Sequence, residues 1–482
     1  MNFISFTFLV FLAVVYSVYW KIPAGEWRKY FLVAASYVFY AWWDWRFCGL
    51  MVLVTGNAYA TGQILARLAA PQQLRVLWAS IALDLAVLGF FKYYGFFVAN
   101  AGTALTALGL DVPLPMLAVV LPIGISFYTF HAISYVVDVY RGKASAERSP
   151  INVALYIAFF PQLVAGPIVR AAFFMPQLQR VPPYVATAHA HGARLILRGV
   201  ICKAVIADTL AQICDPVFAD IGHYNDRALI IALLAFYGQI YFDFAGYSDI
   251  AIGTARLFGY RIPKNFDRPY ASASLTEFWR RWHVSLSFWL RDYVYIPLGG
   301  NRGSPLAFYR NLLATMLLGG LWHGASWNFV IWGGLHGLGL CGHKLWLELR
   351  PRLGDAIDWN GVVWRVTALV LTQLWVLCAW AFFRADSFAD ALEILKATAG
   401  FRHHEGSTLS AIIVVWIVAV IGADHLLRRT RWRADLLPGW LSAGWLSAGW
   451  SGSLFWAGLG AIAAIAIGLM PIAPKPFIYF RF

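Results

Sequence analysis

Residues 311–342 read NLLATMLLGGLWHGASWNFVIWGGLHGLGLCG, and this stretch contains no Asp, Glu, Lys or Arg. A helix that crosses a bilayer needs about 20 predominantly apolar residues. Similar apolar runs recur from Phe3 to Ile472, separated by short segments that carry Arg, Lys, Pro and Gly. Because only helices and closed barrels satisfy their backbone polar groups in lipid, these long runs predict an all-α, polytopic integral membrane protein.

The composition of the chain agrees with this fold class. Of its 482 residues, 60% are hydrophobic and 13% are charged, whereas a soluble domain carries about 25% charged residues. This excludes a cytosolic or secreted enzyme, a coiled coil and a disordered chain. We expect about nine to eleven transmembrane helices, with re-entrant and interfacial helices besides, in a single membrane domain over 1–482. The candidate runs lie near 3–20, 30–46, 48–66, 77–98, 104–121, 122–140, 151–168, 194–214, 228–258, 311–342, 360–384, 408–427 and 453–473.

The distribution of basic residues predicts the topology. The N-terminal run has neither a basic region before it nor an A-x-A cleavage site, so we interpret it as a retained span rather than a signal peptide. Lys21, Arg28 and Lys29 follow that span, which places the N-terminus outside and the first loop in the cytoplasm. The stretch 256–310 holds nine Arg and Lys against three acids and is also expected at the cytoplasmic surface. We therefore assign the net charge of +14 to this bias, and no nucleic-acid partner is expected.

Neither the cysteines nor the other histidine clusters indicate a metal site or a nucleotide site. The five cysteines are odd in number and never approach C-x-x-C spacing, so reduced thiols are expected. His403, His404 and Glu405 lack the H-E-x-x-H spacing, and the sequence contains no Walker A motif or G-x-S-x-G elbow. We expect no metal, no ATP-driven pump and no α/β-hydrolase.

His323 is the strongest candidate for chemistry. It lies 13 residues beyond Arg310 in the uncharged run, about 20 Å along a helix and thus deep in the membrane. An ionisable residue at that depth suggests a functional site. Apolar surroundings keep imidazole neutral, and neutral imidazole can accept a proton from an attacking hydroxyl. The alternative is a histidine that bridges two helices. Gly319, Gly320 and Gly324 would let another helix or a ligand approach closely.

A second histidine lies in an amphipathic stretch. Ser274 and Glu277 fit a capping box at the start of a helix. Aromatic and basic residues interleave in the sequence that follows, FWRRWHVSLSFWLRDYVYIPLGG, which is typical of a helix in the headgroup region. We expect His283 inside this helix, with Trp279 and Ser287 on the same face. Its role is either functional or a hydrogen bond at the interface.

Three further polar residues lie in apolar surroundings. His336 is expected to be structural. Asp243 and Asp249 must pair or reach water. These two acids could orient a histidine, line a substrate tunnel or lock helices together by buried hydrogen bonds, and we favour the last role.

Several long motifs resemble the membrane-bound O-acyltransferase (MBOAT) family. They are LPIGISFYTFHAISYVVDVYRG at 121–142, FFPQLVAGPIVR at 159–170, the run from GQIYFDFAGYSDIAIG to IPLGGNRG at 238–303, LGGLWHGASWNFVIWGGLHG at 318–337, and the terminal FIYFRF. Within the family the motifs most resemble the bacterial alginate O-acetyltransferase type. The resemblance is close over 120–345 and looser elsewhere.

This resemblance implies an MBOAT-like fold and particular site residues. The family's essential histidine falls on His323 and its second histidine on His283. His131 stands where we would expect a glutamine, which leaves the donor pocket unassigned. Basic side chains of the cytoplasmic belt would neutralise the phosphates of the donor, acetyl-CoA, because guanidinium suits bidentate contact; the alternative is anchoring to lipid headgroups. These candidate donor-binding residues are Arg280, Arg281, Arg291 and Lys264.

The function implied is that of an acetyltransferase of the bacterial inner membrane. Acetyl would pass from cytoplasmic acetyl-CoA across the membrane for O-acetylation of an extracytoplasmic polysaccharide such as alginate, through a periplasmic acetyltransferase or acetyl-acceptor protein. His323 would activate the acceptor, and His283 would bind or orient the donor thioester. The alternative within the enzyme class is an O-acyltransferase that modifies cellulose, peptidoglycan or teichoic acid. The rival class is a lipid or acyl-group transporter, which predicts discontinuous helices in two repeated halves; we see no such repeat.

Overall fold

The computed structural model describes residues 1–110, 112–164, 166–352, 358–359 and 361–429, and near the end of the chain 457–458, 460–462, 464–466, 468–469, 475 and 477–478. Over these residues the regular structure is helical, apart from an isolated bridge between Tyr224 and Ser407. The predicted all-α fold is confirmed. The run expected near 453–473 lies largely outside the described residues.

Three helices of the described chain are long and apolar enough to cross a membrane. They are α4 (Ala70–Ala107), α11 (Asp226–Leu257) and α16 (Val362–Arg384). The apolar α1 (Phe6–Lys21) is shorter. The prediction of a membrane protein with several spans is confirmed, whereas the number nine to eleven stays a prediction. The five cysteines, all of them described, form no disulfide with one another.

The described chain forms two compact units. The first contains Met1–Gly192 and Ala251–Pro263, and the second contains Ala193–Ile250 and Lys264–Phe482. That all 482 residues act as a single membrane domain therefore stays a prediction. The two candidate histidines belong to the second unit.

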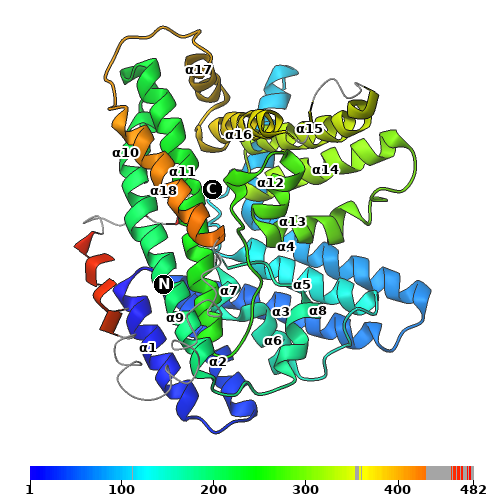
Figure 1. Ribbon diagram of the computed structural model, residues 1–482. Helices are drawn as coiled ribbons and strands as arrows, with labels where there is room; N and C mark the ends of the chain where they lie inside the picture. Colours follow the sequence, from blue (N-terminus) through cyan, green and yellow to red (C-terminus); the bar gives the residue numbers. More distant parts are fainter. Residues whose placement is uncertain are drawn as a thin grey trace. The chain divides into compact units, whose positions relative to one another are not determined.

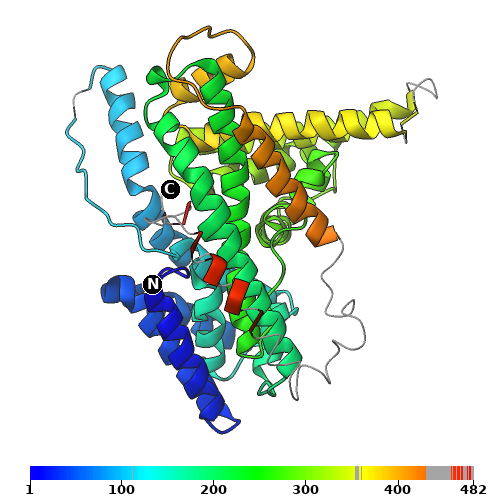
Figure 2. The same ribbon diagram turned by 60° about the vertical axis from the view of Figure 1, so that its left-hand side comes forward.

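The first unit is built around the buried helix α5. Its helices are α1, α2 (Glu26–Asp44), α3 (Cys48–Leu65), α4, α5 (Ile125–Tyr140), α6 (Pro150–Ala158), α7 (Phe160–Leu163) and α8 (Ala171–Leu178), with α9 (Ala186–Val200) at its end. Residues that follow α4 return alongside it, where Tyr94 Oη donates to the Pro115 carbonyl over 2.6 Å (Figure 2). His131, the residue that departs from the family pattern, is buried in α5 and accepts the Val169 N–H over 3.1 Å.

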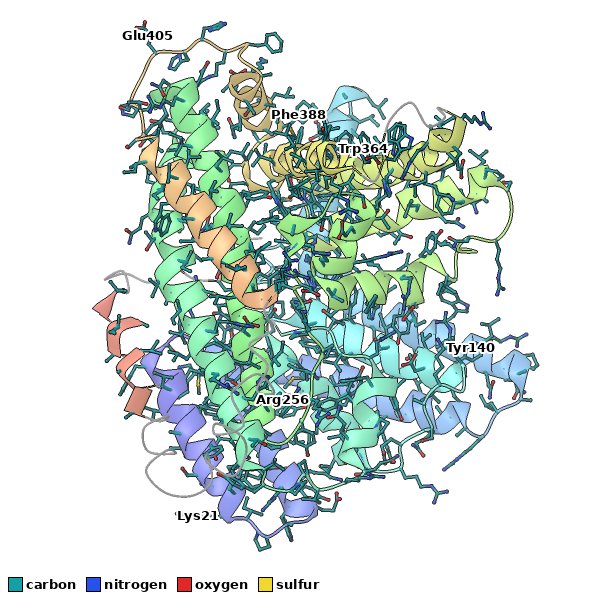
Figure 3. The ribbon with its side chains drawn as sticks, in the orientation of Figure 1. Lys21, Tyr140, Arg256, Trp364, Phe388 and Glu405 are labelled. Carbon is teal, nitrogen blue, oxygen red and sulfur yellow. The ribbon has the colours of Figure 1, made fainter. Side chains whose placement is uncertain are left out.

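The second unit contains the remaining helices (Figure 1). They are the π-helical η2 (Ile201–Ala207), α10 (Asp208–Ala219), η3 (Ile221–His223), α11 as far as Ile250, η4 (Pro269–Ala271), α12 (Leu275–Arg281), α13 (Val284–Leu290), the π-helical η5 (Arg291–Tyr295), α14 (Pro305–His323), α15 (Trp327–Leu349), α16, α17 (Phe388–Thr398) and α18 (Ile412–Arg429). Figure 3 labels Trp364 near the start of α16 and Phe388 at the start of α17.

The uncharged run at 311–342 forms two helices rather than one. The chain turns between His323 and Trp327, and Ser326 Oγ caps α15 by accepting the Asn328 N–H. The two helices cross closely because both carry glycine there. A Cβ atom on Gly320 would overlap the Phe329 carbonyl oxygen, and one on Gly333 would overlap the Met316 carbonyl oxygen. The expectation that small residues beside His323 admit another helix is confirmed.

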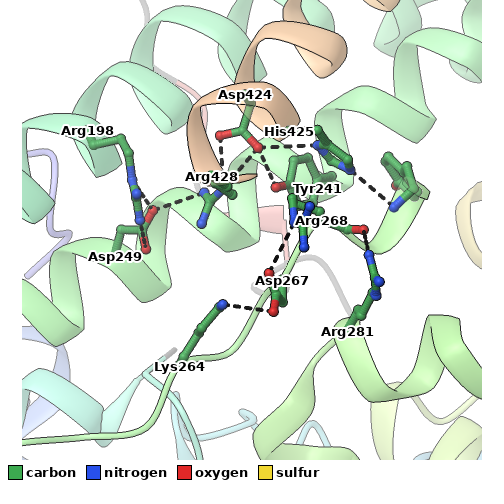
Figure 4. Close-up of polar contacts among 11 residues, drawn as sticks. Arg198, Tyr241, Asp249, Lys264, Asp267, Arg268, Arg281, Asp424, His425 and Arg428 are labelled. Carbon is green, nitrogen blue, oxygen red and sulfur yellow. Dashed lines mark hydrogen bonds and ion pairs between the residues drawn. The ribbon is translucent and has the colours of Figure 1, made fainter. Parts of the chain in front are cut away.

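Buried ion pairs join the helices of the second unit. Asp243 of α11 and Asp208 of α10 flank Lys203 Nζ at 3.1 and 2.6 Å, and all three side chains are at most 2% exposed. Asp249 of α11 pairs with Arg198 at 2.7 Å and with Arg428 of α18 at 3.2 Å (Figure 4). The predicted role of Asp243 and Asp249 in locking helices together is confirmed.

Replacing the glycine at the helix crossing should destabilise the protein. In Gly333→Val the new side chain meets backbone atoms, so we expect the free energy of unfolding to fall by about 1–3 kcal/mol. Thermal unfolding in detergent measures the change. Gly342→Ala in the same helix is the control, because nothing lies within 4 Å of its added Cβ. A Gly333→Val protein as stable as this control would contradict the close crossing.

Lys203 should matter far more than an exposed lysine. Lys203→Met leaves Asp208 and Asp243 buried without a cation, and breaking a buried pair in this way typically costs about 3–5 kcal/mol. Lys264→Met is the matched control, because its side chain is 59% exposed and such exposed pairs contribute about 0–1 kcal/mol. The same unfolding measurement compares the two; equal effects would refute the importance of the buried pair.

Candidate active site

His283 lies at a break between two helices. Ser274 Oγ accepts the Glu277 N–H over 3.2 Å, which starts α12, and that helix ends at Arg281. His283 then takes the left-handed conformation, with φ 39° and ψ 53°, before α13 begins at Val284. The prediction that His283 sits inside one continuous helix was wrong. A non-glycine residue in this conformation costs about 1 kcal/mol or more, so surrounding contacts must hold it there.

The ring of His283 is completely buried. Its Nδ1 lies 3.1 Å from Asn265 Oδ1, and the Phe244 ring meets it edge-on with centroids 4.6 Å apart. Nε2 is buried and has no hydrogen-bond partner among the described residues. Burial lowers the pKa of His283 to about 3, so the imidazole is neutral at physiological pH.

His323 is the last residue of α14 and is also buried. Aromatic rings surround it, with centroid distances of 4.8 Å to Trp332, 5.0 Å to Trp322 and 5.3 Å to Phe383. The His283 ring lies 6.4 Å away, centroid to centroid. Two histidines 40 positions apart in the sequence thus meet in one aromatic pocket, as a shared site requires.

His336 is packed as a structural residue. Trp279 Nε1 donates to its Nδ1 over 3.3 Å, and its ring stacks on Phe278 at 5.9 Å and meets Trp332 edge-on at 4.7 Å. These contacts join α12 to α15, which agrees with the role predicted for it.

The four basic residues predicted to bind the donor do not form one group. Three of them have an acidic neighbour: Lys264 lies 3.0 Å from Asp267, Arg281 lies 2.6 Å from Glu277, and Arg291 lies 2.8 Å from Asp292. Arg280 is exposed and forms no ion pair within the described chain. Their role in donor binding stays a prediction.

The close-up in Figure 4 adds Arg268, which the sequence reasoning missed. Its carbonyl accepts from Arg281 over 3.4 Å, and its Nε lies 3.5 Å from Asp267. Lys264 and Arg268 therefore flank Asp267, and Arg281, which pairs with Glu277, joins this basic cluster through the Arg268 carbonyl. Nothing in the residue spacing signals this cluster, because the chain between 264 and 274 is largely non-helical.

A cavity of about 350 Å³ lies beside the pocket of His323. Phe383 lines this cavity and also contacts the His323 ring. The ring of Phe383 therefore borders both the imidazole and the cavity. The walls carry Ser326, Asn328, Arg384 and Asp386 among apolar side chains.

Arg384 is a further charged residue that sequence reasoning missed. Its side chain is 11% exposed, its Nη2 donates to Asp215 Oδ1 over 3.2 Å, and it lies over the Phe218 ring at 4.7 Å. Asp386, next to it along the chain, is 82% exposed. The cavity therefore has a polar end that reaches the protein surface. Among the described residues no group of three or more His, Cys, Asp and Glu is arranged to hold a metal ion.

Comparison with known proteins identifies relatives of this chain. The family model for the membrane-bound O-acyltransferases (MBOAT) matches residues 142–378. The probable alginate O-acetylase AlgI of Azotobacter vinelandii is 42% identical over 405 residues, covering 83% of this chain and 78% of the relative. The protein of the same name from Pseudomonas putida is 37% identical over the full length of both chains. The peptidoglycan O-acetyltransferase of Helicobacter pylori is 34% identical over 403 residues, which cover 78% of this chain and 74% of the relative.

Proposed function

This chain belongs to the membrane-bound O-acyltransferase family, and from that premise we propose that it carries acetyl from cytoplasmic acetyl-CoA to an acceptor hydroxyl outside the inner membrane. It is a membrane O-acetyltransferase, as the names of its relatives support. The observation that carries the finer proposal is the pair of buried histidine rings, 6.4 Å apart, beside a cavity with a polar opening.

The reaction needs a group that takes a proton and returns it. The acceptor hydroxyl attacks the thioester carbonyl, so that a C–O bond forms and the C–S bond of acetyl-CoA breaks. His323 takes the hydroxyl proton as the attack proceeds, and the CoA thiolate receives a proton as it leaves. The buried aromatic pocket suits a neutral imidazole, which is the form able to accept that proton.

We assign donor binding to the basic residues between Lys264 and Arg291. CoA carries several phosphates, which the cluster of Lys264, Arg268 and Arg281 would contact in competition with Asp267 and Glu277. Arg280 offers an exposed cation that pairs with no acidic side chain of the described residues. Arg291 lies 4.7 Å from the Phe288 ring and pairs with Asp292, so its contribution would be weaker.

Acceptor access is assigned to the cavity. Arg310 lies near the start of α14 and His323 at its end, and this helix of 19 residues is about 28 Å long. If the Arg310 end of α14 faces the cytoplasm under the positive-inside rule, the cavity beside His323 lies towards the other side of the inner membrane. The same rule places the N-terminus outside.

The acceptor proposed is an extracytoplasmic polysaccharide such as alginate, reached through periplasmic acetyl-acceptor or acetyltransferase proteins. Two relatives of high coverage are named as alginate O-acetylases. The relative from Helicobacter pylori favours peptidoglycan as the second candidate acceptor. The transporter hypothesis is discarded, because the family is one of acyltransferases.

His323→Ala should abolish acetyl transfer. Loss of the proton acceptor predicts a fall in rate of about 10²–10⁴-fold, without loss of the protein from the membrane. Membranes supplied with radiolabelled acetyl-CoA report the transferred label, and identifying the labelled product also decides between the candidate acceptors. His343→Ala is the control, because this half-buried histidine contacts Thr276 away from the pocket. Normal transfer by His323→Ala would remove the central assignment.

Phe383→Ala should let acetyl-CoA be hydrolysed without transfer of acetyl to the acceptor. Removing the ring that borders both His323 and the cavity admits water, so acetyl-CoA hydrolysis without acceptor should rise relative to transfer. Release of free CoA thiol and of labelled acetate measures this ratio. Phe388→Ala is the matched control, because that ring is 50% exposed at the start of α17. An unchanged ratio in Phe383→Ala would contradict the acceptor path proposed here.

A further inference from the structure

We propose that Asn265 is a positioning residue that fixes His283 in the tautomer with its proton on Nδ1, so that Nε2 acts as a second proton acceptor beside His323. The inference rests on the proposed acyl transfer. Asn265 lies in the non-helical segment that follows α11, and it is only 1% exposed. None of the motifs considered from the sequence assigns it a role.

The orientation of the Asn265 amide follows from its neighbours. Oδ1 receives the backbone N–H of Ser285 over 3.3 Å and the Ser285 hydroxyl over 2.9 Å. A backbone N–H can only donate, so the amide atom that faces it is the oxygen. On the other side of the amide, Nδ2 donates to Ser248 Oγ of α11 over 3.0 Å. Both contacts fix the same orientation of the amide.

The tautomer of His283 follows from that orientation. Its Nδ1 lies 3.1 Å from the same Oδ1, which can only accept, so Nδ1 carries the proton of the neutral ring. Nε2 is then a bare lone pair. It is buried, and no described residue donates to it. Leaving such an acceptor unsatisfied costs free energy, which a reacting hydroxyl in the site would recover.

Asn265 also holds the strained backbone at this position. Its carbonyl accepts the Val284 N–H over 2.9 Å, immediately after the left-handed His283. The side chain and the main chain of Asn265 therefore clamp both sides of one residue. Without this clamp the chain would lose the contacts that offset the unfavourable φ of His283.

This geometry changes the role that the sequence suggested for His283. A neutral ring with its proton on Nδ1 cannot donate from Nε2 to the thioester carbonyl oxygen, so it does not orient the donor by that bond. Instead, after the hydroxyl attacks the thioester, Nε2 receives the proton of the His323 imidazolium through one bridging water, because the two ring centroids are 6.4 Å apart. It returns that proton to the CoA thiolate when the C–S bond breaks. The Asn265 oxygen stabilises the transient charge on His283, because it accepts the Nδ1 proton throughout.

The test compares Asn265→Ala and Asn265→Asp in the full chain in membranes. Asn265→Ala should lower kcat by about 10²-fold and leave the KM for acetyl-CoA within about twofold, because the residue acts on the proton acceptor and not on donor binding. Asn265→Asp keeps the accepting oxygen, so it should restore much of kcat. Its carboxylate favours imidazolium and raises the pKa of His283. As the pH is lowered, the ring is therefore protonated earlier, and activity should fall at a higher pH than in the unsubstituted chain.

Asn311→Ala is the matched control, because Asn311 is also 1% exposed and its amide donates to the Gly300 carbonyl. Nitrogen-15 NMR of labelled histidines, with His283→Gln to assign the signal, should show the Nδ1–H tautomer in the unsubstituted chain and its loss in Asn265→Ala. The NMR measurement does not depend on enzymatic activity, so it also applies if Asn265→Ala has lost activity because the protein is less stable.

Three results would overturn the inference: an unchanged kcat in Asn265→Ala, a pH profile of Asn265→Asp identical to that of the unsubstituted chain, or a proton found on Nε2. If His323→Ala abolishes transfer while any of these holds, the inference about Asn265 fails and the proposed function stands. If His323→Ala transfers acetyl normally, the proposed function fails as well.

Discussion

The near-contact of two helix backbones at Gly320 and Gly333 decides where the His323 imidazole lies. With no side chain between them, α14 and α15 approach until carbonyl oxygens occupy the space of the missing Cβ atoms. That approach places Trp332 of α15 against His323 at the end of α14. A wider crossing would move the tryptophan away and leave a polar ring at the edge of a void. In a membrane, where helices gain little from hydrophobic association, small residues are what permit this packing.

A second constraint is the cost of burying polar groups. The second unit meets it by pairing opposite charges, across helices as Lys203 does with Asp243 and Arg428 with Asp249, and within α18 as Arg428 does with Asp424. Around the histidines the solution differs, because neutral rings and amides replace ion pairs. The site thereby keeps acceptor atoms available without placing a permanent charge in apolar surroundings.

The fold class could be predicted from the sequence, and His283 and His323 could be singled out as candidate site residues, but the geometry between them could not be predicted. Long apolar runs and the Trp-His-Gly triplet are local features of the sequence, so they can be recognised without knowing which residues meet in space. The position of His283 was predicted wrongly, because its neighbours at i−4 and i+4 match a helix while the contact that breaks the helix comes from Asn265. The link from Arg384 to Asp215 spans 169 positions, and no periodic pattern encodes such a pair.

The ring of Phe383 has consequences for timing. It is wedged between Phe329, Trp332 and Trp380, with centroids 5.0–5.3 Å apart. A lone exposed ring reorients within nanoseconds, whereas a wedged one moves only when its neighbours give way together, on the slower scale of collective motions. The rate of turnover would then depend on how often this aromatic cluster loosens, and between such events an acyl donor bound in the site would be shielded from hydrolysis. Access to His323 from the cavity would then be gated by this slow rearrangement of aromatic rings.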